Sequence, residues 1–380
     1  MEQVTYRFQD VCQTITDYVA NGSFKSLADN VQYSNDKDYA RLIRLVDFNN
    51  NYDEKNAIWV PESSYNFLKK SVLYGNEVII SNVGANLGTV FKCPKLDYPM
   101  TLGPNSILIK TNDLCNQDYL YYYLKSRIGY NKIMALVSGS AMPKFNKTEL
   151  RNMKISLPNR NYQDKVVELL SKIDKKIELN NKINNNLYEE AVALYKNKFK
   201  EIKQGKKTIG EYVIPKRGKN LLTRDAVNGD IPVVAGGIEP SAYHNKYNTK
   251  SPVITISASG ANAGYTNLWM VPVWASDCSY IDDSVTKNVY FWYVVLKTRQ
   301  KEIFDAQTGS AQAHIYPRHI ADMPIAELNL DEVRNYNVLV EPLFKKIGEN
   351  KKENEQLSQL RDTLLPKLMN GEIDLNSIEI

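Results

Sequence analysis

The sequence predicts an α+β protein in which two globular domains alternate with two long helices, and those helices pair antiparallel as a coiled coil. Three observations predict this architecture. Short motifs recur in the same order in both halves of the 380-residue chain. A long helical pattern follows each set of motifs. The regions before those patterns are rich in strand and turn residues without regular strand–helix alternation, which is typical of α+β domains.

The internal repeat rests on three motifs. Each half contains an apolar run that enters a Gly-Ala-Asn-x-Gly turn, then an aromatic stretch, then a Gly-Ser-Ala segment. The matched pairs are Val78–Gly88 with Ile254–Gly264, Leu120–Arg127 with Trp292–Arg299, and Ser138–Ala141 with Thr308–Ala311. Gly309 follows Gly139 by 170 residues (309 − 139). Three motifs in one order indicate a duplication of long period.

The two long helical patterns are displaced by the same interval. Residues at alternating steps of three and four run from Val166 to Leu194, and an equivalent seam runs from Val340 to Leu368, in which Val340 follows Leu170 by 170 residues (340 − 170). This spacing is typical of a coiled-coil seam rather than of the wider apolar stripe of a core helix. The first helix is expected over about 161–200, which at 1.5 Å per residue is roughly 60 Å.

Four asparagines interrupt these seams, namely Asn180, Asn184, Asn350 and Asn354. Paired polar side chains inside a seam can fix the register of two helices. If the helices are antiparallel, these four side chains meet near the middle of the pair. The alternative is that they lie on a solvated stretch of an exposed helix.

The predicted boundaries divide the chain into four segments. These are 1–158 for the first domain, 159–206 for the first helix, 207–328 for the second domain, and 329–380 for the second helix and a C-terminal tail. In the first domain, strand character is expected in Tyr39–Phe48 and Asn76–Lys92. Short helices are expected around Asp118–Lys132 and Asn288–Asp305.

Composition indicates an ordinary globular protein without metal chemistry. The formal net charge is +5, and the four cysteines are scattered without CxxC spacing. Metal and redox sites need clustered ligands, so neither a metal nor a cofactor is expected. The chain has no apolar run long enough to span a bilayer and no signal-peptide layout at its start, so a cytoplasmic location is expected. The mild positive charge is compatible with a polyanionic partner.

The two Gly-Ala-Asn-x-Gly turns allow two interpretations. Gly-rich loops can cradle phosphates, but Gly84–Gly88 and Gly260–Gly264 lack the Lys-Ser or Lys-Thr of a P-loop and the acidic residue of a dinucleotide fingerprint. A tight turn with positive φ is the favoured alternative.

Basic and amide side chains in predicted loops are the candidates for contact with nucleic acid. Lys and Arg reach phosphates and guanine, and Asn reaches adenine. The candidates are Arg41, Arg44, Lys69, Lys70, Asn86 and Lys144 in the first half, and Lys216, Arg217, Lys219, His244, Lys246, Asn262, Arg318 and His319 in the second. Each alone is better explained as a solvated surface residue than as a base reader, and together they predict a basic face rather than a base-by-base code.

At this point the sequence resembles the specificity subunits of type I restriction–modification enzymes. The resemblance covers essentially the whole chain. The second domain contributes IPVVAGGIEPSAYHNKYN, SPVITISASGANAGYTN and VPVWASDCSYI, and the first contributes LIRLVDFNN, NEVIISNVGANLGTV and GSAMPKFNKTELRNMKISLP. The ending LSQLRDTLLPKLMNGEI is similar to the conserved distal helix of that family and is the most specific single motif.

The resemblance implies two target-recognition domains, each reading one half of a bipartite double-stranded DNA site. It also implies that the two helices set the unread spacer and bind two methyltransferase subunits, and that restriction/translocase subunits complete the complex. Many family members carry a basic residue in the loop that here contains Ser257 and Ser259.

Catalytic motifs are absent from the sequence. It contains no Asn/Asp-Pro-Pro-aromatic loop of an adenine methyltransferase, no clustered carboxylates with a lysine, and no P-loop. We therefore expect no catalytic residue in this chain and expect catalysis in its partners. Three alternatives stay open: a specificity subunit of another multi-subunit restriction class, a protein-binding scaffold, and a small-molecule enzyme that uses the glycine turns. Steep salt dependence of DNA binding would separate a DNA reader from the last two.

Overall fold

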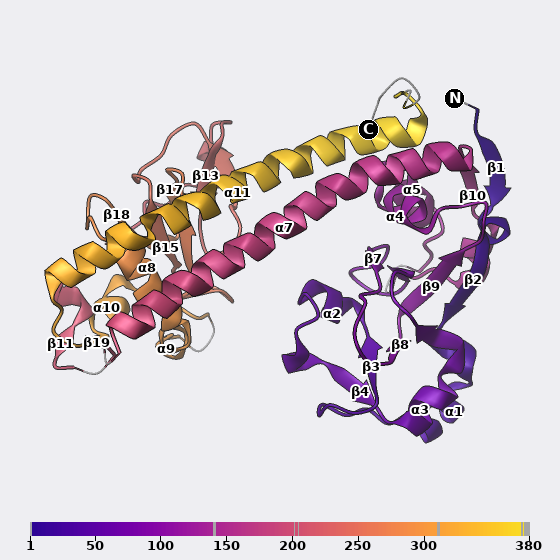
Figure 1. Cartoon of the computed structure of the whole chain (residues 1–380), viewed down its shortest axis with the longest axis horizontal. Helices are drawn as coiled ribbons and strands as arrows, with labels where there is room; N and C mark the ends of the chain where they lie inside the picture. The colour runs from indigo at the N-terminus through magenta and orange to yellow at the C-terminus, as the bar shows by residue number, and fades with distance from the viewer. Residues whose placement is uncertain are drawn as a thin grey trace. The chain divides into compact units, whose positions relative to one another are not determined.

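The computed structural model describes residues 2–139, 142–200, 202–203, 205–309, 312–373 and 375. It divides into two compact units, drawn in Figure 1: residues 1–175 together with 357–380 form unit 1, and residues 176–356 form unit 2. Residues of both long helices therefore belong to each unit.

Unit 1 combines two four-stranded sheets with a short two-stranded ladder. The sheet orders are β2-β9-β6-β7 and β4-β3-β8-β5, and β1 pairs with β10. The strands are β1 Val4–Arg7, β2 Cys12–Asp17, β3 Ala40–Ile43, β4 Ile58–Val60, β5 Val72–Leu73, β6 Val78–Ser81, β7 Val90–Lys92, β8 Met100–Leu102, β9 Ser106–Thr111 and β10 Lys154–Leu157. The short helices are α1 Phe24–Asn30, α2 Leu45–Asn49, α3 Glu62–Phe67, α4 Gln117–Lys125, α5 Arg127–Met134 and α6 Lys147–Asn152.

Unit 2 repeats this plan with one strand fewer among the described residues. Its sheet orders are β12-β18-β15-β16 and β14-β13-β17, and β11 pairs with β19. The strands are β11 Lys207–Thr208, β12 Lys216–Arg217, β13 Ile231–Val234, β14 Ala242–His244, β15 Val253–Ser257, β16 Thr266–Trp269, β17 Trp274–Ala275, β18 Cys278–Asp282 and β19 Pro324–Ile325. The short helices are α8 Val289–Thr298, α9 Gln300–Asp305 and α10 Pro317–Ala321.

The duplication extends to strand pairing. In both units one sheet contains a parallel pair, β3 with β8 and β13 with β17, whereas the strands of the other sheet are antiparallel. Ser81 lies opposite Ser106 in unit 1, and Ser257 lies opposite Cys278 in unit 2. Residues can therefore be matched between the units by register as well as by sequence.

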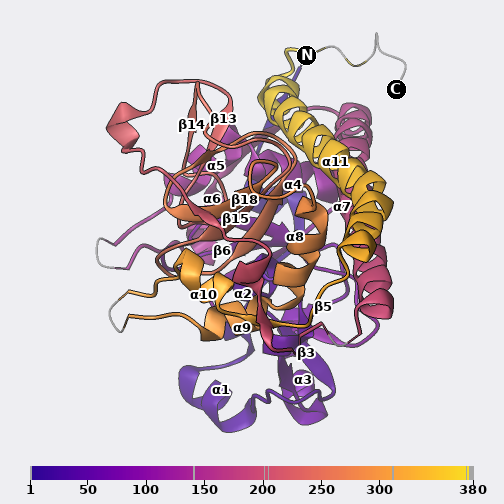
Figure 2. The same ribbon diagram turned by 90° about the vertical axis from the view of Figure 1, so that its left-hand side faces the viewer.

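The long helices are α7, Arg160–Lys198, and α11, Leu330–Asn370. Within each unit they lie side by side and run antiparallel (Figure 1 and Figure 2). In unit 1, Arg361 pairs with Asp174 at 2.8 Å. In unit 2, the Tyr336 hydroxyl donates to the Ala191 carbonyl oxygen at 2.8 Å. The α+β class and the antiparallel coiled coil predicted from the sequence are confirmed.

Each unit has its own hydrophobic core. In unit 1, Tyr119, Tyr122 and Tyr123 of α4 pack with the first half of α7 and the end of α11. In unit 2, α8 is so apolar that Phe291, Val294 and Leu296 are completely buried. These aromatic helices are the stretches that repeat in the sequence.

One predicted strand and both predicted short helices need correction. The strand expected over Tyr39–Phe48 ends at Ile43, because the Asp47 carboxylate accepts the Arg44 backbone N–H and begins α2. Each predicted short helix is two helices. The first breaks at Ser126, whose hydroxyl accepts the Gly129 N–H and caps α5. The second breaks at Arg299, between α8 and α9.

Candidate nucleic-acid interface

The glycine turn has the same backbone form in both units. Gly84 and Gly260 have φ of +89° and +80°, and no neighbouring atom lies within 4 Å of an added Cβ. Glycine is required there for its backbone conformation rather than for space. The turn's own N–H groups are used internally, since Gly88 donates to Ser81 and Gly264 donates to Ser257. This geometry favours the tight-turn interpretation over a phosphate cradle.

A second loop lies beside each glycine turn. The Gly84 N–H donates to the Pro143 carbonyl at 3.1 Å, and the Gly260 N–H donates to the Ala313 carbonyl at 3.0 Å. We call the described residues of 82–88 and 138–144 the first loop pair, and those of 258–264 and 308–314 the second loop pair. Of the Gly-Ser-Ala segments, Ser140, Ala141, Ser310 and Ala311 lie outside the described residues.

In unit 1 the candidates occupy separate places. Asn86 and Lys144 are exposed in the first loop pair, which a bridge between Val83 and Lys144 holds together. A cavity of about 460 Å³ adjoins the same turn and is lined in part by Phe48 and Tyr130. Lys69 and Lys70 lie in a different segment, a 3-10 turn over Lys69–Ser71, where the Lys70 ammonium donates to the Ala20 carbonyl at 3.1 Å.

Arg41 and Arg44 form a third group around a buried carboxylate. Arg41 lies in β3 rather than in a loop and is fully buried, with its guanidinium 3.8 Å from Asp47. The Arg44 guanidinium donates to both Asp47 oxygens, at 2.9 and 3.0 Å. A charge without access to solvent cannot meet DNA on the surface, so Arg41 acts within the fold.

In unit 2 several candidates belong to one connected arrangement. Lys216 and Arg217 are exposed on β12. The Arg217 Nη2 donates to Asp277 Oδ1 at 2.5 Å, and the Ser259 hydroxyl donates to Asp277 Oδ2. Lys219 follows directly, and its N–H donates to the Ala275 carbonyl at 2.9 Å. These contacts join β12 to the second loop pair, where Asn262 also lies.

His244 lies behind this surface. It is buried, and its ring meets Trp274 edge-on with centroids 5.1 Å apart. The Trp274 indole N–H in turn donates to the Lys219 carbonyl at 2.8 Å. The imidazole Nδ1 accepts the Val227 N–H at 3.0 Å, so His244 supports the surface from within. Lys246 is exposed nearby in sequence, beyond the end of β14.

Aromatic and basic side chains gather at the other edge of the second loop pair. The His314 ring stacks on Tyr316 with centroids 6.0 Å apart, and the Arg318 guanidinium lies 5.9 Å from the Tyr316 ring. His319 meets Tyr316 edge-on at 5.5 Å. Burial, reinforced by the Arg318 charge, lowers the pKa of His319, so its imidazole is neutral at pH 7. His314, Asp277 and Ser259 were missed as candidates, although His314 occupies the position of Lys144 in the repeat.

The four seam asparagines meet in unit 2. The Asn180 amide donates to Asn354 Oδ1 at 2.9 Å, and the Asn350 amide donates to Asn184 Oδ1 at 2.8 Å. Asn180, Asn184 and Asn350 are buried, so they do not lie on a solvated stretch of helix. Buried amides that satisfy one another are costly to displace along the helix axis, and their role in setting register remains a prediction.

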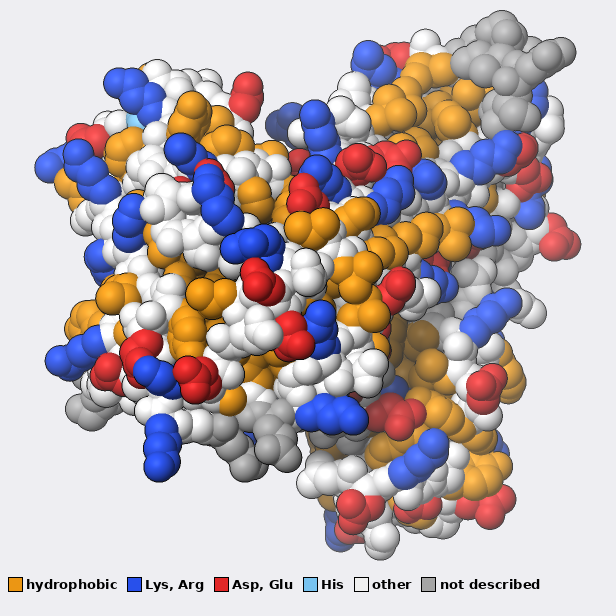
Figure 3. Space-filling view, turned by 60° about the vertical axis from the view of Figure 1, so that its left-hand side comes forward, with side chains coloured by type: hydrophobic (Ala, Val, Ile, Leu, Met, Phe, Trp, Pro, Cys, Tyr) orange, Lys and Arg blue, Asp and Glu red, His pale blue; other side chains and the backbone are white. Residues whose placement is uncertain are grey.

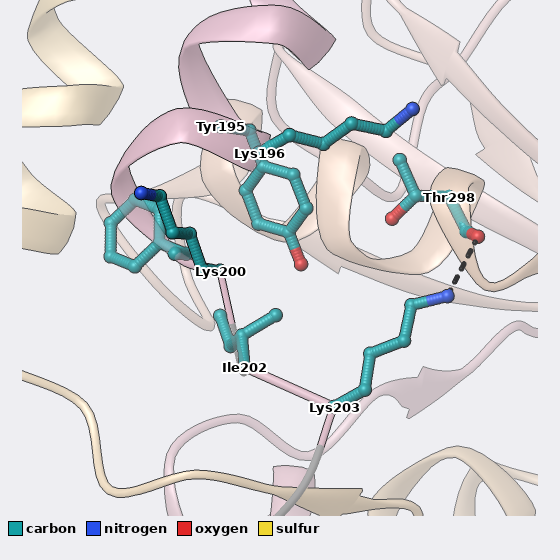
Figure 4. A pocket seen from close by; sticks show the side chains of 7 residues that line it. Tyr195, Lys196, Lys200, Ile202, Lys203 and Thr298 are labelled. Carbon is teal, nitrogen blue, oxygen red and sulfur yellow. Dashed lines mark hydrogen bonds between the residues drawn. The ribbon is translucent and has the colours of Figure 1, made fainter.

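A cavity of about 520 Å³ at the end of α7 has three lysines in its lining, Lys196, Lys200 and Lys203. In Figure 4 the ammonium groups point apart, and Lys203 donates to the Thr298 carbonyl at 3.4 Å. The three charges therefore do not converge on one anion. On the face drawn in Figure 3, Lys and Arg side chains are interspersed with Asp and Glu rather than gathered in one patch.

The described residues include neither a metal-binding cluster nor a membrane-spanning helix. No group of three or more His, Cys, Asp or Glu side chains in the described part of the chain is arranged to hold a metal ion. No helix among the described residues combines the length and apolar character needed to cross a membrane.

Comparison with known proteins identifies the family. Residues 3–189 match the model of the type I restriction modification DNA specificity domain. Residues 3–189 thus belong to the type I restriction–modification DNA specificity domains, and the chain as a whole is similar to specificity subunits of that family. The specificity subunit of the type I restriction enzyme MjaIX from Methanocaldococcus jannaschii is 27% identical over an alignment of 321 positions that covers 74% of this chain and 74% of the relative.

A solved structure supports the fold of this chain. The S subunit of a type I restriction–modification system from M. genitalium superimposes with a TM-score of 0.59 at 19% identity. The match covers 97% of this chain and 96% of the other. At this level of identity the likeness concerns the fold alone.

Proposed function

We propose that this chain is a specificity subunit that reads a bipartite, asymmetric site on double-stranded DNA. Residues 1–158 form one target-recognition domain and residues 207–328 the other, and each reads one half of the site. The segments 159–206 and 329–380 supply the paired helices that fix the length of the unread spacer. A helix of 39 residues is about 60 Å long, so such a pair exceeds the ~34 Å turn of B-DNA.

One observation carries this proposal: the two domains share a backbone plan but differ in the side chains of their loop pairs. By strand register, Val83 corresponds to Ser259, and Asn105 corresponds to Asp277. Lys144 corresponds to His314 through the matching bridges of the two loops. Base edges are distinguished by the donors and acceptors that meet them. Different donors and acceptors on one scaffold support two different half-sites rather than a palindrome.

The proposed partners supply the chemistry. Two methyltransferase subunits bind the helices and methylate adenine, and restriction/translocase subunits join them to cut DNA. The chain itself is non-catalytic and uses no cofactor. Support comes from the sequence, which lacks catalytic motifs, and from its relative, which is a specificity subunit of a type I restriction enzyme. Because the target is genomic and invading DNA, the complex works in the cytoplasm.

The basic and amide residues contribute unequally in this proposal. Side chains in or near the loop pairs and β12 contact DNA, namely the exposed Asn86, Lys144, Lys216, Arg217, Lys219 and Arg318 and the half-buried Asn262. Lys69, Lys70 and Lys246 are further surface contacts to phosphate. Arg41, Arg44, His244 and His319 hold the scaffold that presents them.

The test is a map of methylated adenines in cells with and without the gene. We expect a split motif that disappears without the gene. Exchange of residues 210–325 for those of another specificity subunit should change one half of the motif and leave the other half and the spacer intact. A change in both halves, or no motif that depends on the gene, would contradict the proposal. Steep loss of DNA affinity with salt distinguishes a DNA reader from a protein scaffold.

A further inference from the structure

Two hydrogen bonds through Asp277 join Arg217 to Ser259 at the edge of the second loop pair. One Asp277 oxygen accepts from the Arg217 guanidinium at 2.5 Å, and the other accepts from the Ser259 hydroxyl. The Arg217 side chain is 44% exposed and the Asp277 side chain 34% exposed. A carboxylate held from one side by a hydroxyl thus orients an arginine that faces solvent.

We propose that Arg217 reads a guanine in the half-site of the second domain, with Asp277 and Ser259 as its positioning residues. This inference rests on the proposed function, and it deepens that function by naming one base and the side chain that recognises it. Arginine that donates two parallel N–H groups to guanine O6 and N7 is the commonest specific contact in the major groove.

The chemistry of the pair favours a base over a phosphate. Asp277 offsets much of the guanidinium charge and repels a phosphate, whereas a neutral base edge with two acceptors gains from oriented donors. Among the described residues, the only hydrogen bond of the Arg217 guanidinium is the one to Asp277, so most of its N–H groups remain available. Each Asp277 oxygen already accepts one hydrogen bond within the protein.

The backbone around the arginine is held close to its neighbours. A Cβ added at Gly218 would lie 2.4 Å from the Ser276 carbonyl oxygen, and the Gly218 N–H donates to the Cys278 carbonyl at 2.8 Å. Ser259 is fixed similarly, because a Cβ at Gly236 would lie 2.7 Å from its carbonyl oxygen. Selective recognition requires that the side chain that contacts the base is itself held in position by its neighbours.

The first domain does not reproduce this arrangement. Arg217 lies opposite Ser279 in the ladder between β12 and β18, and by the same register Asp17 lies opposite Ile107 between β2 and β9. Asp17 pairs with Lys147 at 2.8 Å. The positions of Asp277 and Ser259 are occupied by Asn105 and Val83. The guanine contact therefore belongs to one half of the site only.

The experiment maps methylated adenines in cells that carry the complete restriction–modification system with single variants of the full-length subunit. Arg217→Ala is expected to make one guanine position degenerate in the half-motif assigned to residues 210–325, with discrimination at that position falling about 10- to 100-fold. Arg217→Lys should have the same effect, because lysine keeps the charge but lacks the two parallel N–H groups of arginine. Asp277→Asn should relax the same position by about tenfold, and Ser259→Ala by less.

Arg7→Ala is the matched control, since Arg7 forms an exposed Arg–Asp pair with Asp10 in the other unit. It should leave both half-motifs unchanged. A uniform loss of methylation with Arg217→Ala that Arg217→Lys restores would identify a phosphate contact and overturn the inference. An unchanged motif with Arg217→Ala would also overturn it, while the proposed function stands as long as the wild-type motif is split and depends on the gene. The unaffected half-motif reports that each variant folds.

Discussion

The two units share most of their strand order but place their charged side chains differently. In the first, the basic candidates form three separate groups, and the most deeply placed arginine is buried beside Asp47. In the second, β12, the second loop pair and the segment before β18 are joined through Asp277. The duplicated backbone therefore determines where the loops emerge, whereas the ion pairs determine whether an arginine is buried in the core or exposed on the surface.

The greatest loss of stability is expected when the carboxylate beside the buried arginine is removed. Asp47→Ala removes the carboxylate that compensates buried Arg41 and receives Arg44. Loss of one partner of a buried ion pair should lower the free energy of unfolding by about 3–5 kcal/mol. Urea unfolding followed by circular dichroism measures it. Asp10→Ala, which breaks an exposed pair, is the control and should leave the free energy of unfolding nearly unchanged. Equal effects of the two variants would mean that Arg41 and Arg44 are not structural.

A medium effect is expected in the helix pair, where unit 2 uses asparagines and unit 1 uses Arg361 with Asp174. Asn350→Leu leaves the Asn184 carbonyl oxygen without its donor, so unfolding should become easier by about 1–3 kcal/mol. The double variant Asn184→Leu/Asn350→Leu should recover most of that loss, because no buried amide is left unpaired. Denaturant unfolding gives the coupling, and light scattering reports the oligomeric state. Additive losses in the double variant would contradict a paired role.

A smaller effect is expected in the pH dependence of the stability of unit 2. The Lys297 ammonium donates to the Thr266 carbonyl at 2.9 Å. Burial, with a contribution from the Lys351 charge, lowers the pKa of Lys297 to about 8. An unfolded lysine titrates near 10.4, so between about pH 8 and 10 the unfolded state binds a proton that the folded state has released. The contribution of Lys297 to the stability of unit 2 should therefore rise with pH through that window, against the opposite contribution of Cys278, whose pKa burial raises.

Tryptophan fluorescence suits this measurement, because Trp269, Trp274 and Trp292 lie in unit 2 and only Trp59 lies in unit 1. Lys297→Met should remove the rise between pH 8 and 10. A rise that persists in Lys297→Met would assign it to another group.

Much of the fold could be predicted because its signals are periodic or local. The 3–4 spacing predicted helices close to the observed α7 and α11, and the spacing of the asparagines anticipated their meeting. The glycine turns were predicted because positive φ at Gly84 and Gly260 excludes most other residues. Such features depend on neighbours within a few residues or on a repeat that the sequence displays twice.

The candidate site was predicted less completely, because its contacts are distant in sequence. Arg217 and Asp277 are brought together by β12 and β18, which nothing in their local sequence reveals. The burial of Arg41 was missed for a related reason. A guanidinium is polar in any sequence pattern, and its partner Asp47 belongs to a short helix that was predicted to be strand.

The division of the long helices has a consequence for synthesis on the ribosome. Unit 2 is one uninterrupted stretch, 176–356, whereas unit 1 needs residues 357–380 as well as 1–175. The Gln3 amide, for instance, donates to the Met369 carbonyl at 3.1 Å. Because translation proceeds from the N-terminus, the half that begins the chain is the half that finishes folding last. A premature stop codon just after position 356 would spare unit 2 and leave unit 1 without its share of α11.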